Sequence, residues 1–194
     1  AIDRGAPVKI ESTVKNTDRA VGAMLSGEIA KVYGHAGLPD DTAGTLAPRL
    51  ARLGGQLLVQ TIAGLRAGTI TPIPQDHAQA TMAPLLKKED GAIDWTMSAS
   101  ALVNRIRGLS PWPGAYTFHG SERWTIWKAV AAPEPASSGP GTVLAVTKQS
   151  IRVATGEGTL ELLEIQTANS KRMSVGHYLA GHCVSAGERL GAAV

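Results

Sequence analysis

Three pairs of basic residues are spaced so that they could bind the phosphate groups of a nucleic acid. Lysine and arginine attract phosphates through an interaction that weakens as the salt concentration rises. The alternative for each pair is an ordinary solvated surface, and an arginine on a helix can also lay its stem along apolar surface with its charged end in water. The six candidate residues are Lys87 and Lys88, Arg105 and Arg107, and Lys171 and Arg172.

The tryptophans offer a second kind of nucleic-acid contact, because an indole ring can stack on an unpaired base. All four lie within one stretch of the chain: Trp95, Trp112, Trp124 and Trp127. Trp112 stands between two prolines, and Trp124 is in phase with Ile126 on one face of a predicted strand. Packing explains both positions better than stacking. We therefore predict that the tryptophans belong to the core and to a rigid corner.

Metal and dinucleotide chemistry find little support in the sequence. His177 and His182 are five residues apart, Cys183 is the single cysteine, and no Cys-x-x-Cys motif occurs. Zinc sites normally show closer ligand spacings. The glycines around Glu157 lack the six-residue pattern of a dinucleotide site, so we predict a hairpin turn there. We expect neither a metal nor a dinucleotide cofactor.

A helix with regular apolar spacing must begin near residue 42 and end near Gly68. Either Thr42 or Thr45 could cap it, and Pro48 helps to decide between them. With Thr45 as the cap, Pro48 falls in the first turn, where its missing N–H costs little; with Thr42 it removes an interior bond. We therefore favour Thr45. Its apolar residues are Leu46, Leu50, Leu53, Leu57, Leu58, Ile62 and Leu65.

Residues 71–88 contain three prolines and no hydrophobic period, which predicts an extended linker. A second helix then begins at Ser98 or Ser100, with one apolar stripe. Arg105 and Arg107 project to either side of that stripe, because successive helical residues are about 100° apart. The stripe consists of Leu102, Val103, Ile106 and Leu109.

The rest of the chain predicts strands. Candidates are residues 114–119, 123–130, 141–147, 151–155 and 159–166, followed by a short helix at 175–180 capped by Ser174. Five short strands with a helix or two favour a small barrel of the oligonucleotide-binding type. Residues 1–38 have no sustained period, with one possible strand at 8–14. The predicted fold is thus an α/β remnant, the end of an open parallel-sheet domain, followed by an oligonucleotide-binding-like β-barrel.

Composition limits the class of protein. The chain has 194 residues, 43% of them hydrophobic, which is enough for one large or two small domains. No run of about 18 apolar residues exists, so we expect no membrane partner. Residues 1–88 hold ten Lys and Arg against seven Asp and Glu, and residues 89–194 hold nine of each. A single cysteine fits a reducing, cytoplasmic location, and the start at Ala1 suggests part of a longer polypeptide.

Several motifs, in order, resemble the methionyl-tRNA formyltransferase family. APLLKKEDGAIDW is similar to the family's linker pattern APKLSKEDxxIDW, and DTAGTLAPRLARLGGQLLVQTIAGLRAG resembles the last long helix of its catalytic domain. PWPGAYT and LELLEIQTANSKRMSVGHYLAGH resemble the family's C-terminal barrel. The likeness covers roughly residues 41–194. PWPGAYT favours this family over related folate-dependent enzymes.

The resemblance implies transfer of a formyl group from 10-formyltetrahydrofolate to the amino group of methionine on initiator tRNA, at the start of translation. It also implies a cytoplasmic enzyme that is monomeric at full length. We expect residues 1–70 to be the end of the formyltransferase domain, residues 71–88 a linker, and residues 89–194 the barrel that binds tRNA. The six basic residues above become its candidate tRNA contacts.

The catalytic half of the family pattern is not found in this sequence. The family's Asn and His, followed by SLLP, are absent, and Ala20 occupies the position of the catalytic Asp. Residues 6–21 depart from the pattern throughout, as real divergence or a compensated reading-frame error would produce. We assign no catalytic residue and expect the chain alone to be inactive. The alternatives are a non-catalytic RNA-binding module and a related folate-dependent formyltransferase or hydrolase.

Overall fold

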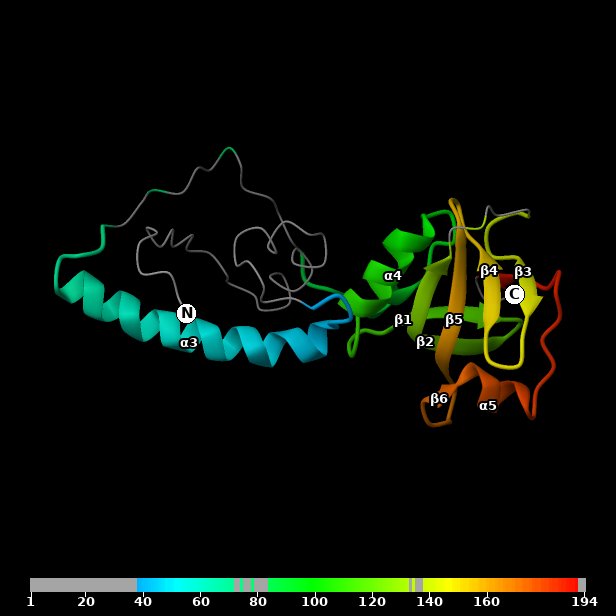
Figure 1. Cartoon of the computed structure of the whole chain (residues 1–194). Coiled ribbons are helices and arrows are strands. Elements are labelled where there is room, and N and C mark those ends of the chain that lie inside the picture. Colours follow the sequence, from blue (N-terminus) through cyan, green and yellow to red (C-terminus); the bar gives the residue numbers. More distant parts are fainter. Residues whose placement is uncertain are drawn as a thin grey trace.

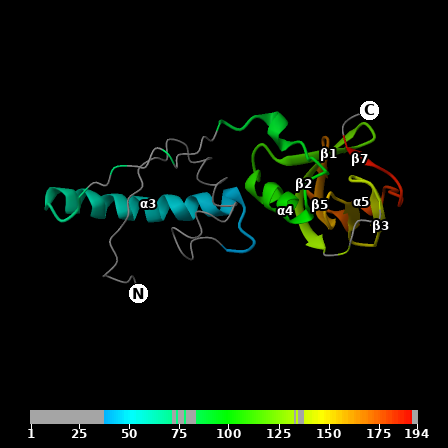
Figure 2. The same ribbon diagram turned by 90° about the horizontal axis from the view of Figure 1, so that it is seen from above.

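The computed structural model describes residues 38–71, 74, 78, 84–132, 134 and 138–191. The possible strand at 8–14 and the position of Ala20 lie outside these residues. In the described part, a long helix precedes a curled antiparallel sheet that carries two shorter helices (Figure 1). Both views show the long helix extending away from the sheet (Figures 1 and 2).

The long helix, α3, spans Ala43–Arg66 and is capped by Thr42, so our prediction of Thr45 as the cap is wrong. The Thr42 hydroxyl accepts a hydrogen bond from the Thr45 N–H at 3.2 Å, and the Thr45 hydroxyl accepts one from the Thr42 N–H at 2.9 Å. This reciprocal pair satisfies two backbone donors at the helix start. Pro48 consequently lies inside the helix, where it cannot donate to the preceding turn.

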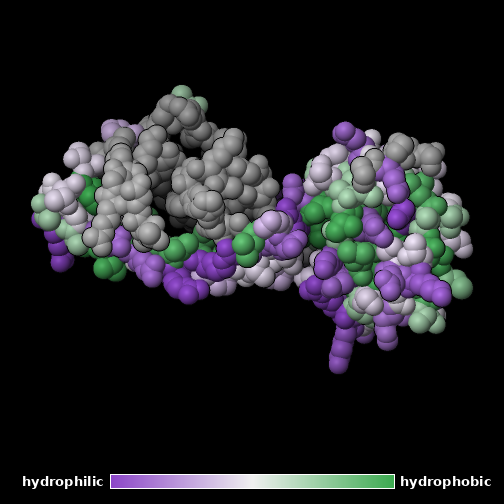
Figure 3. All heavy atoms as spheres, viewed as in Figure 1, coloured by the Kyte–Doolittle hydropathy of each residue, from purple (hydrophilic) through white to green (hydrophobic). Residues whose placement is uncertain are grey.

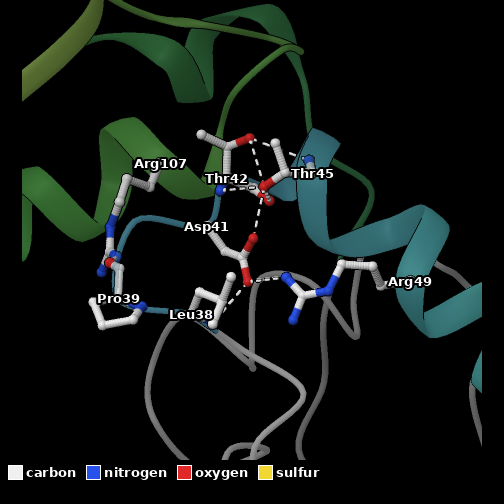
Figure 4. Close-up of polar contacts among 7 residues, drawn as sticks. All are labelled: Leu38, Pro39, Asp41, Thr42, Thr45, Arg49 and Arg107. Carbon is white, nitrogen blue, oxygen red and sulfur yellow. Dashed lines mark hydrogen bonds and ion pairs between the residues drawn. The ribbon is translucent and has the colours of Figure 1, made fainter.

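The buried carboxylate of Asp41 strengthens this earlier start. It accepts hydrogen bonds from the Leu38 N–H (2.6 Å), the Thr45 hydroxyl (2.9 Å) and the Arg49 guanidinium (2.5 Å) (Figure 4). Burial alone would raise the pKa of Asp41, but these hydrogen bonds and the charge of Arg49 hold the pKa below its ordinary value. A carboxylate at a helix N-terminus is also favoured by the helix dipole.

Tertiary contacts attach the first turn of α3 to the segment that follows the next helix. The Gly44 N–H, which has no partner within its helix, donates to the Ser110 carbonyl at 3.0 Å. A Cβ on Gly44 would lie 2.9 Å from Pro111 Cδ, so only glycine fits this approach. Arg107 of the next helix also donates to the Pro39 carbonyl, in the segment before α3 (Figure 4).

Beyond its first turn α3 exposes apolar side chains. These are Leu53, Leu58, Val59, Ile62 and Leu65. Apolar residues are visible among polar ones along this end of the molecule (Figure 3). No helix among the described residues is long and apolar enough to cross a membrane.

A short 3₁₀ helix, η2, spans Lys88–Gly91, at the end of the predicted linker and the start of the predicted barrel. The Asp90 carboxylate closes it by accepting the Lys87 N–H at 2.6 Å. Much of residues 72–83 lies outside the described set. The second helix, α4, spans Ala99–Gly108 with Ser98 as its cap, which confirms one of our two alternatives.

The sheet contains all five predicted strands and two short ones that we missed. Their bounds are β1 Ala115–His119, β2 Glu122–Ala132, β3 Val143–Val146, β4 Ile151–Ala154, β5 Thr159–Thr167, β6 Met173–Ser174 and β7 Leu190–Gly191. The order is β3-β4-β5-β2-β1-β7, with β6 beside β5, and every pair is antiparallel. The final helix, α5, spans Val175–Leu179 and is capped by Ser174 as predicted.

The C-terminal segment is hydrogen-bonded to both edges of this curled sheet. On one side β7 pairs with β1. On the other side, Leu190 N–H donates to Gly141 carbonyl and Val143 N–H donates to Glu188 carbonyl, each at 2.8 Å. Two-residue strands carry too little periodicity to be detected in the sequence, which explains why β6 and β7 were missed.

The core lies between the sheet and α4. The four tryptophans differ in how deeply they are buried. Trp124 is fully buried and Trp95 nearly so, and Trp95 donates to the Thr117 hydroxyl at 3.1 Å. Trp112 is 52% exposed, so our prediction that it packs at the corner is wrong. The two prolines beside it fix the turn, and the indole is left at the surface. Trp127 is half-buried on the outward face of β2.

Candidate nucleic-acid interface

Strand β2 presents a basic and aromatic outer face because its side chains alternate. Trp124 and Ile126 point into the core, and their neighbours Arg123 and Thr125 therefore point outward. The register shifts near residue 127, so that Trp127 and Lys128 follow one another at the surface. A bulge of this kind re-aims side chains.

One guanidinium–aromatic pair lies where β1 meets β2. The guanidinium carbon of the exposed Arg123 lies 3.9 Å from the centre of the Tyr116 ring. Tyr116 also meets Phe118 edge to face, with ring centres 5.9 Å apart. Attraction between a cation and a ring face is effective within about 6 Å.

A second pair lies where β2, β5 and β6 meet. The guanidinium carbon of Arg172 lies 5.3 Å from the centre of the Trp127 ring. The Trp127 indole N–H donates to Gln166 Oε1 at 3.0 Å, and the Gln166 amide donates to the Ser170 carbonyl at 2.8 Å. Arg172 Nε donates to Glu164 Oε2 at 2.5 Å. Hydrogen bonds thus orient both the ring and the cation above it.

The linker lysines come shortly before the segment that contacts Tyr116 of the first pair. Lys87 and Lys88 are exposed at the start of η2. The end of η2 packs on β1, because the Ile93 N–H donates to the Tyr116 carbonyl at 2.8 Å and a Cβ on Gly91 would lie 3.0 Å from the Tyr116 ring. Lys87 and Lys88 thus precede a segment that is bonded to the edge of β1, and Lys171 and Arg172 precede β6, which pairs with β5.

The remaining two predicted contacts, Arg105 and Arg107, are bound within the chain. Arg105 donates to the Asp90 carbonyl of η2, and Arg107 donates to the Pro39 carbonyl and, at 2.6 Å, to Asn104 Oδ1. Their guanidinium groups thus attach α4 to η2 and to the segment before α3. Sequence reasoning had considered only nucleic acid and water as partners for them. It also missed Tyr116, which the alternation of β1 could have indicated.

A separate polar cluster includes His119 and Glu122, at the hairpin that joins β1 to β2. His119 Nε2 and Glu188 Oε2 are 2.6 Å apart, and this hydrogen bond holds the pKa of Glu188 below its ordinary value. The Tyr178 hydroxyl donates to Glu122 Oε2 at 3.1 Å. Burial, with the nearby charge of Glu122, raises the pKa of Tyr178 to about 12.

His182, which precedes Cys183, packs on an aromatic ring. The His182 ring stacks on Tyr178, with ring centres 4.1 Å apart, and Cys183 is exposed. No group of three metal-ligating side chains occurs among the described residues.

Comparison with known proteins assigns the family. The family model described as formyl transferase, C-terminal domain, matches residues 85–183, which is half of the chain. The chain belongs to this family. The resemblance noted in the sequence is therefore confirmed. A second model, described as GXGXG motif, matches residues 1–67. No Gly-x-Gly-x-Gly sequence occurs in that range, and most of it lies outside the described residues.

Two similar curated relatives are methionyl-tRNA formyltransferases. The methionyl-tRNA formyltransferase of Solibacter usitatus is 48% identical over 153 residues, covering 79% of this chain and 49% of the relative. The methionyl-tRNA formyltransferase of Koribacter versatilis is 45% identical over 154 residues, covering 79% of this chain and 48% of the relative. The chain thus spans about half the length of the curated relatives it matches.

A solved structure with a similar fold is HypX from Aquifex aeolicus in complex with tetrahydrofolic acid. Its TM-score is 0.51 at 14% sequence identity, over 74% of this chain and 26% of that chain. An identity this low shows a common fold only. The curled antiparallel sheet is therefore the part of our fold prediction that is supported.

Proposed function

We propose that this chain is the tRNA-binding part of a methionyl-tRNA formyltransferase, which acts at the start of translation in the cytoplasm. The observation that carries the proposal is the 48% identity to a methionyl-tRNA formyltransferase over 153 residues. The partner is initiator methionyl-tRNA, and the whole enzyme would work as a monomer.

The basic residues would bind the tRNA backbone. Lys87 and Lys88 are exposed on η2, beside the outer face of the sheet, and Lys171 is exposed at its other edge. Each lysine would contribute one phosphate contact. Arg105 and Arg107 would contribute differently, by fixing η2 and the start of α3 relative to α4.

The proposed domain division follows the family pattern. Residues 89–194 would form a barrel of the oligonucleotide-binding type, residues 71–88 the linker, and residues 1–70 the end of the catalytic domain. The bonding of the C-terminal segment to both edges of the sheet supports a closed barrel. The position of η2, at the junction of linker and barrel, supports the second boundary.

The formyl donor would be 10-formyltetrahydrofolate, bound by residues other than those described. Formyl transfer needs a hydrogen-bond donor for the developing oxyanion and a base for the amine proton. Among the described residues, Asn104 is engaged by Arg107 and His119 by Glu188. These residues do not fit a formyl-transfer site, so we derive no catalytic step and expect the chain alone to be inactive.

Binding of the whole chain to initiator and elongator tRNA across a salt series tests this function, with a formylation assay alongside. We expect salt-sensitive binding without formylation. Lys88→Ala should lower the magnitude of the slope of log affinity against log salt by about one. Lys148→Ala, an exposed lysine in the β3–β4 turn, is the matched control.

Absence of tRNA binding, or tight binding that salt does not weaken, would contradict the tRNA-binding function. Formylation by this chain would contradict the proposal that its catalytic centre lies elsewhere. An equal change of slope in Lys88→Ala and Lys148→Ala would contradict the location of the interface on η2.

A further inference from the structure

We propose that Arg172 and Trp127 form a stacking site for one unpaired base of the bound RNA. The inference rests on the tRNA-binding function proposed above and changes the role given to Arg172. Instead of neutralising a phosphate, its planar guanidinium would lie between the base and the indole ring.

The charge of Arg172 is already compensated within the chain. Arg172 Nε donates to Glu164 Oε2 at 2.5 Å, and its Nη2 contacts the same oxygen. An arginine paired in this way adds little to a long-range attraction for phosphate. The guanidinium face turned away from the indole remains usable, because the Arg172 side chain is 52% exposed. Guanidinium planes and aromatic rings are the surfaces on which RNA-binding proteins stack unpaired bases.

The pair is held in place before any ligand binds. Glu164 fixes the guanidinium, and Gln166 fixes the indole through a 3.0 Å hydrogen bond to the ring N–H. The Ser170 carbonyl in turn holds the Gln166 amide at 2.8 Å. A base that stacks here orders little of the protein, so less of the stacking energy is lost to side-chain entropy.

The surroundings favour a nucleic acid as the occupant. Lys128 and Lys171 are exposed next to Trp127 and Arg172 in sequence, where they could contact the phosphates that flank the base. A similar pair, Arg123 over Tyr116, starts four residues earlier on β2, about 13 Å away at roughly 3.3 Å per residue. Double-stranded RNA hides its base faces, so the ligand must present unpaired nucleotides.

The decisive variant is Arg172→Lys, which keeps the positive charge and removes the planar guanidinium. We expect its affinity for tRNA and for a single-stranded oligonucleotide to fall about 5- to 50-fold. The salt slope should stay unchanged, and so should affinity for an RNA duplex. The matched control is Arg152→Lys on β4, because Arg152 pairs with Glu134 at 2.9 Å but is not part of this aromatic face.

Trp127→Phe, which keeps a smaller ring, gives a second measurement in the intact chain. We expect an intermediate loss of affinity, together with loss of the tryptophan-fluorescence quenching that a single-stranded oligonucleotide causes in the wild type. Melting temperatures of all variants would be recorded, because a purely structural pair would lower stability and leave affinity unchanged.

The outcomes separate the two proposals. If the wild-type chain binds no RNA, the proposed function fails and the stacking site fails with it. If it binds tRNA in a salt-dependent manner but Arg172→Lys and Arg152→Lys bind equally well, only the stacking site is overturned. A lower salt slope in Arg172→Gln, which removes the positive charge, would also overturn it, because that result would make Arg172 a phosphate contact.

Discussion

Gly156, in the turn between β4 and β5, allows the segment after η2 to dock on the sheet, and Gly156→Ala should disrupt this docking. The Gly156 N–H donates to the Trp95 carbonyl at 2.9 Å and to the Met97 carbonyl at 3.0 Å. The neighbouring Glu157 carbonyl accepts the Ala99 N–H at 2.9 Å, at the first residue of α4. This glycine therefore fixes both the buried Trp95 and the start of α4.

The size of the effect follows from the space available. A Cβ on Gly156 would lie 1.8 Å from the Thr96 carbonyl oxygen, whereas real Cβ contacts are almost never under 3.0 Å. The backbone must therefore separate by about 1.2 Å (3.0 − 1.8). That movement breaks two or three hydrogen bonds of about 0.5–1.5 kcal/mol each and disturbs the packing of Trp95. We expect the free energy of unfolding to fall by about 2–4 kcal/mol.

Thermal unfolding, followed by circular dichroism and tryptophan fluorescence, measures this loss. For a domain of about 100 residues it corresponds to a melting temperature lower by roughly 10–20 °C. Gly181→Ala is the control, because no atom lies within 4 Å of its added Cβ, and it should change stability by less than about 0.5 kcal/mol. If Gly156→Ala had the same melting temperature as Gly181→Ala and the wild type, Gly156 would not be needed for this docking.

Three further predictions concern titratable groups. Asp41→Ala should speed hydrogen exchange at the start of α3, because about 2–3 kcal/mol of local stability is lost, whereas Asp40→Ala, at an exposed position, should not. Folding lowers the pKa of Asp41, so its stabilisation is present at neutral pH. It is lost as the pH falls from the ordinary aspartate pKa through the lower pKa of the folded state. Tyr178 should ionise only near pH 12 in an ultraviolet titration, and Tyr178→Phe should remove that step. Because folding raises the pKa of Tyr178, the free energy of unfolding should fall as the pH rises from 10 to about 12. Glu188→Gln should weaken the bond to His119, costing about 0.5–1 kcal/mol in urea unfolding at neutral pH; an unchanged unfolding midpoint would contradict a stabilising role for this pair.

The strands were predictable because the information for them is local. Strands β1, β2 and β5 each alternate more and less buried residues over at least four positions, and turn residues separate the five strands. The pairing of β2 with β5, which brings Trp127 next to Gln166, is not local. The outer face could be anticipated strand by strand, but not as a single surface.

The sequence predicted which basic residues to consider for the candidate site, but not which groups their side chains contact. Lys87 and Lys88 are exposed, as two adjacent charges in a linker suggest. Arg107 binds the Pro39 carbonyl, a residue 68 positions away, which no helical spacing can indicate. A cation in a sequence shows only that a charge needs a partner. Whether that partner is water, a phosphate or a carbonyl depends on which segments the fold brings together.

The start of α3 shows how a correct local rule can give the wrong boundary. Pro48 inside a helix costs roughly 3 kcal/mol, and this cost favoured Thr45 as the cap. The Thr42 capping box recovers about 1 kcal/mol, and hydrogen bonds to the Asp41 carboxylate contribute about 1.5–3 kcal/mol each. The Gly44 N–H finds its acceptor on Ser110, 66 residues later (110 − 44). The hydrogen bonds of Asp41 depend on its burial, and that of Gly44 depends on a distant carbonyl. Tertiary structure therefore decides which of the two threonines caps the helix.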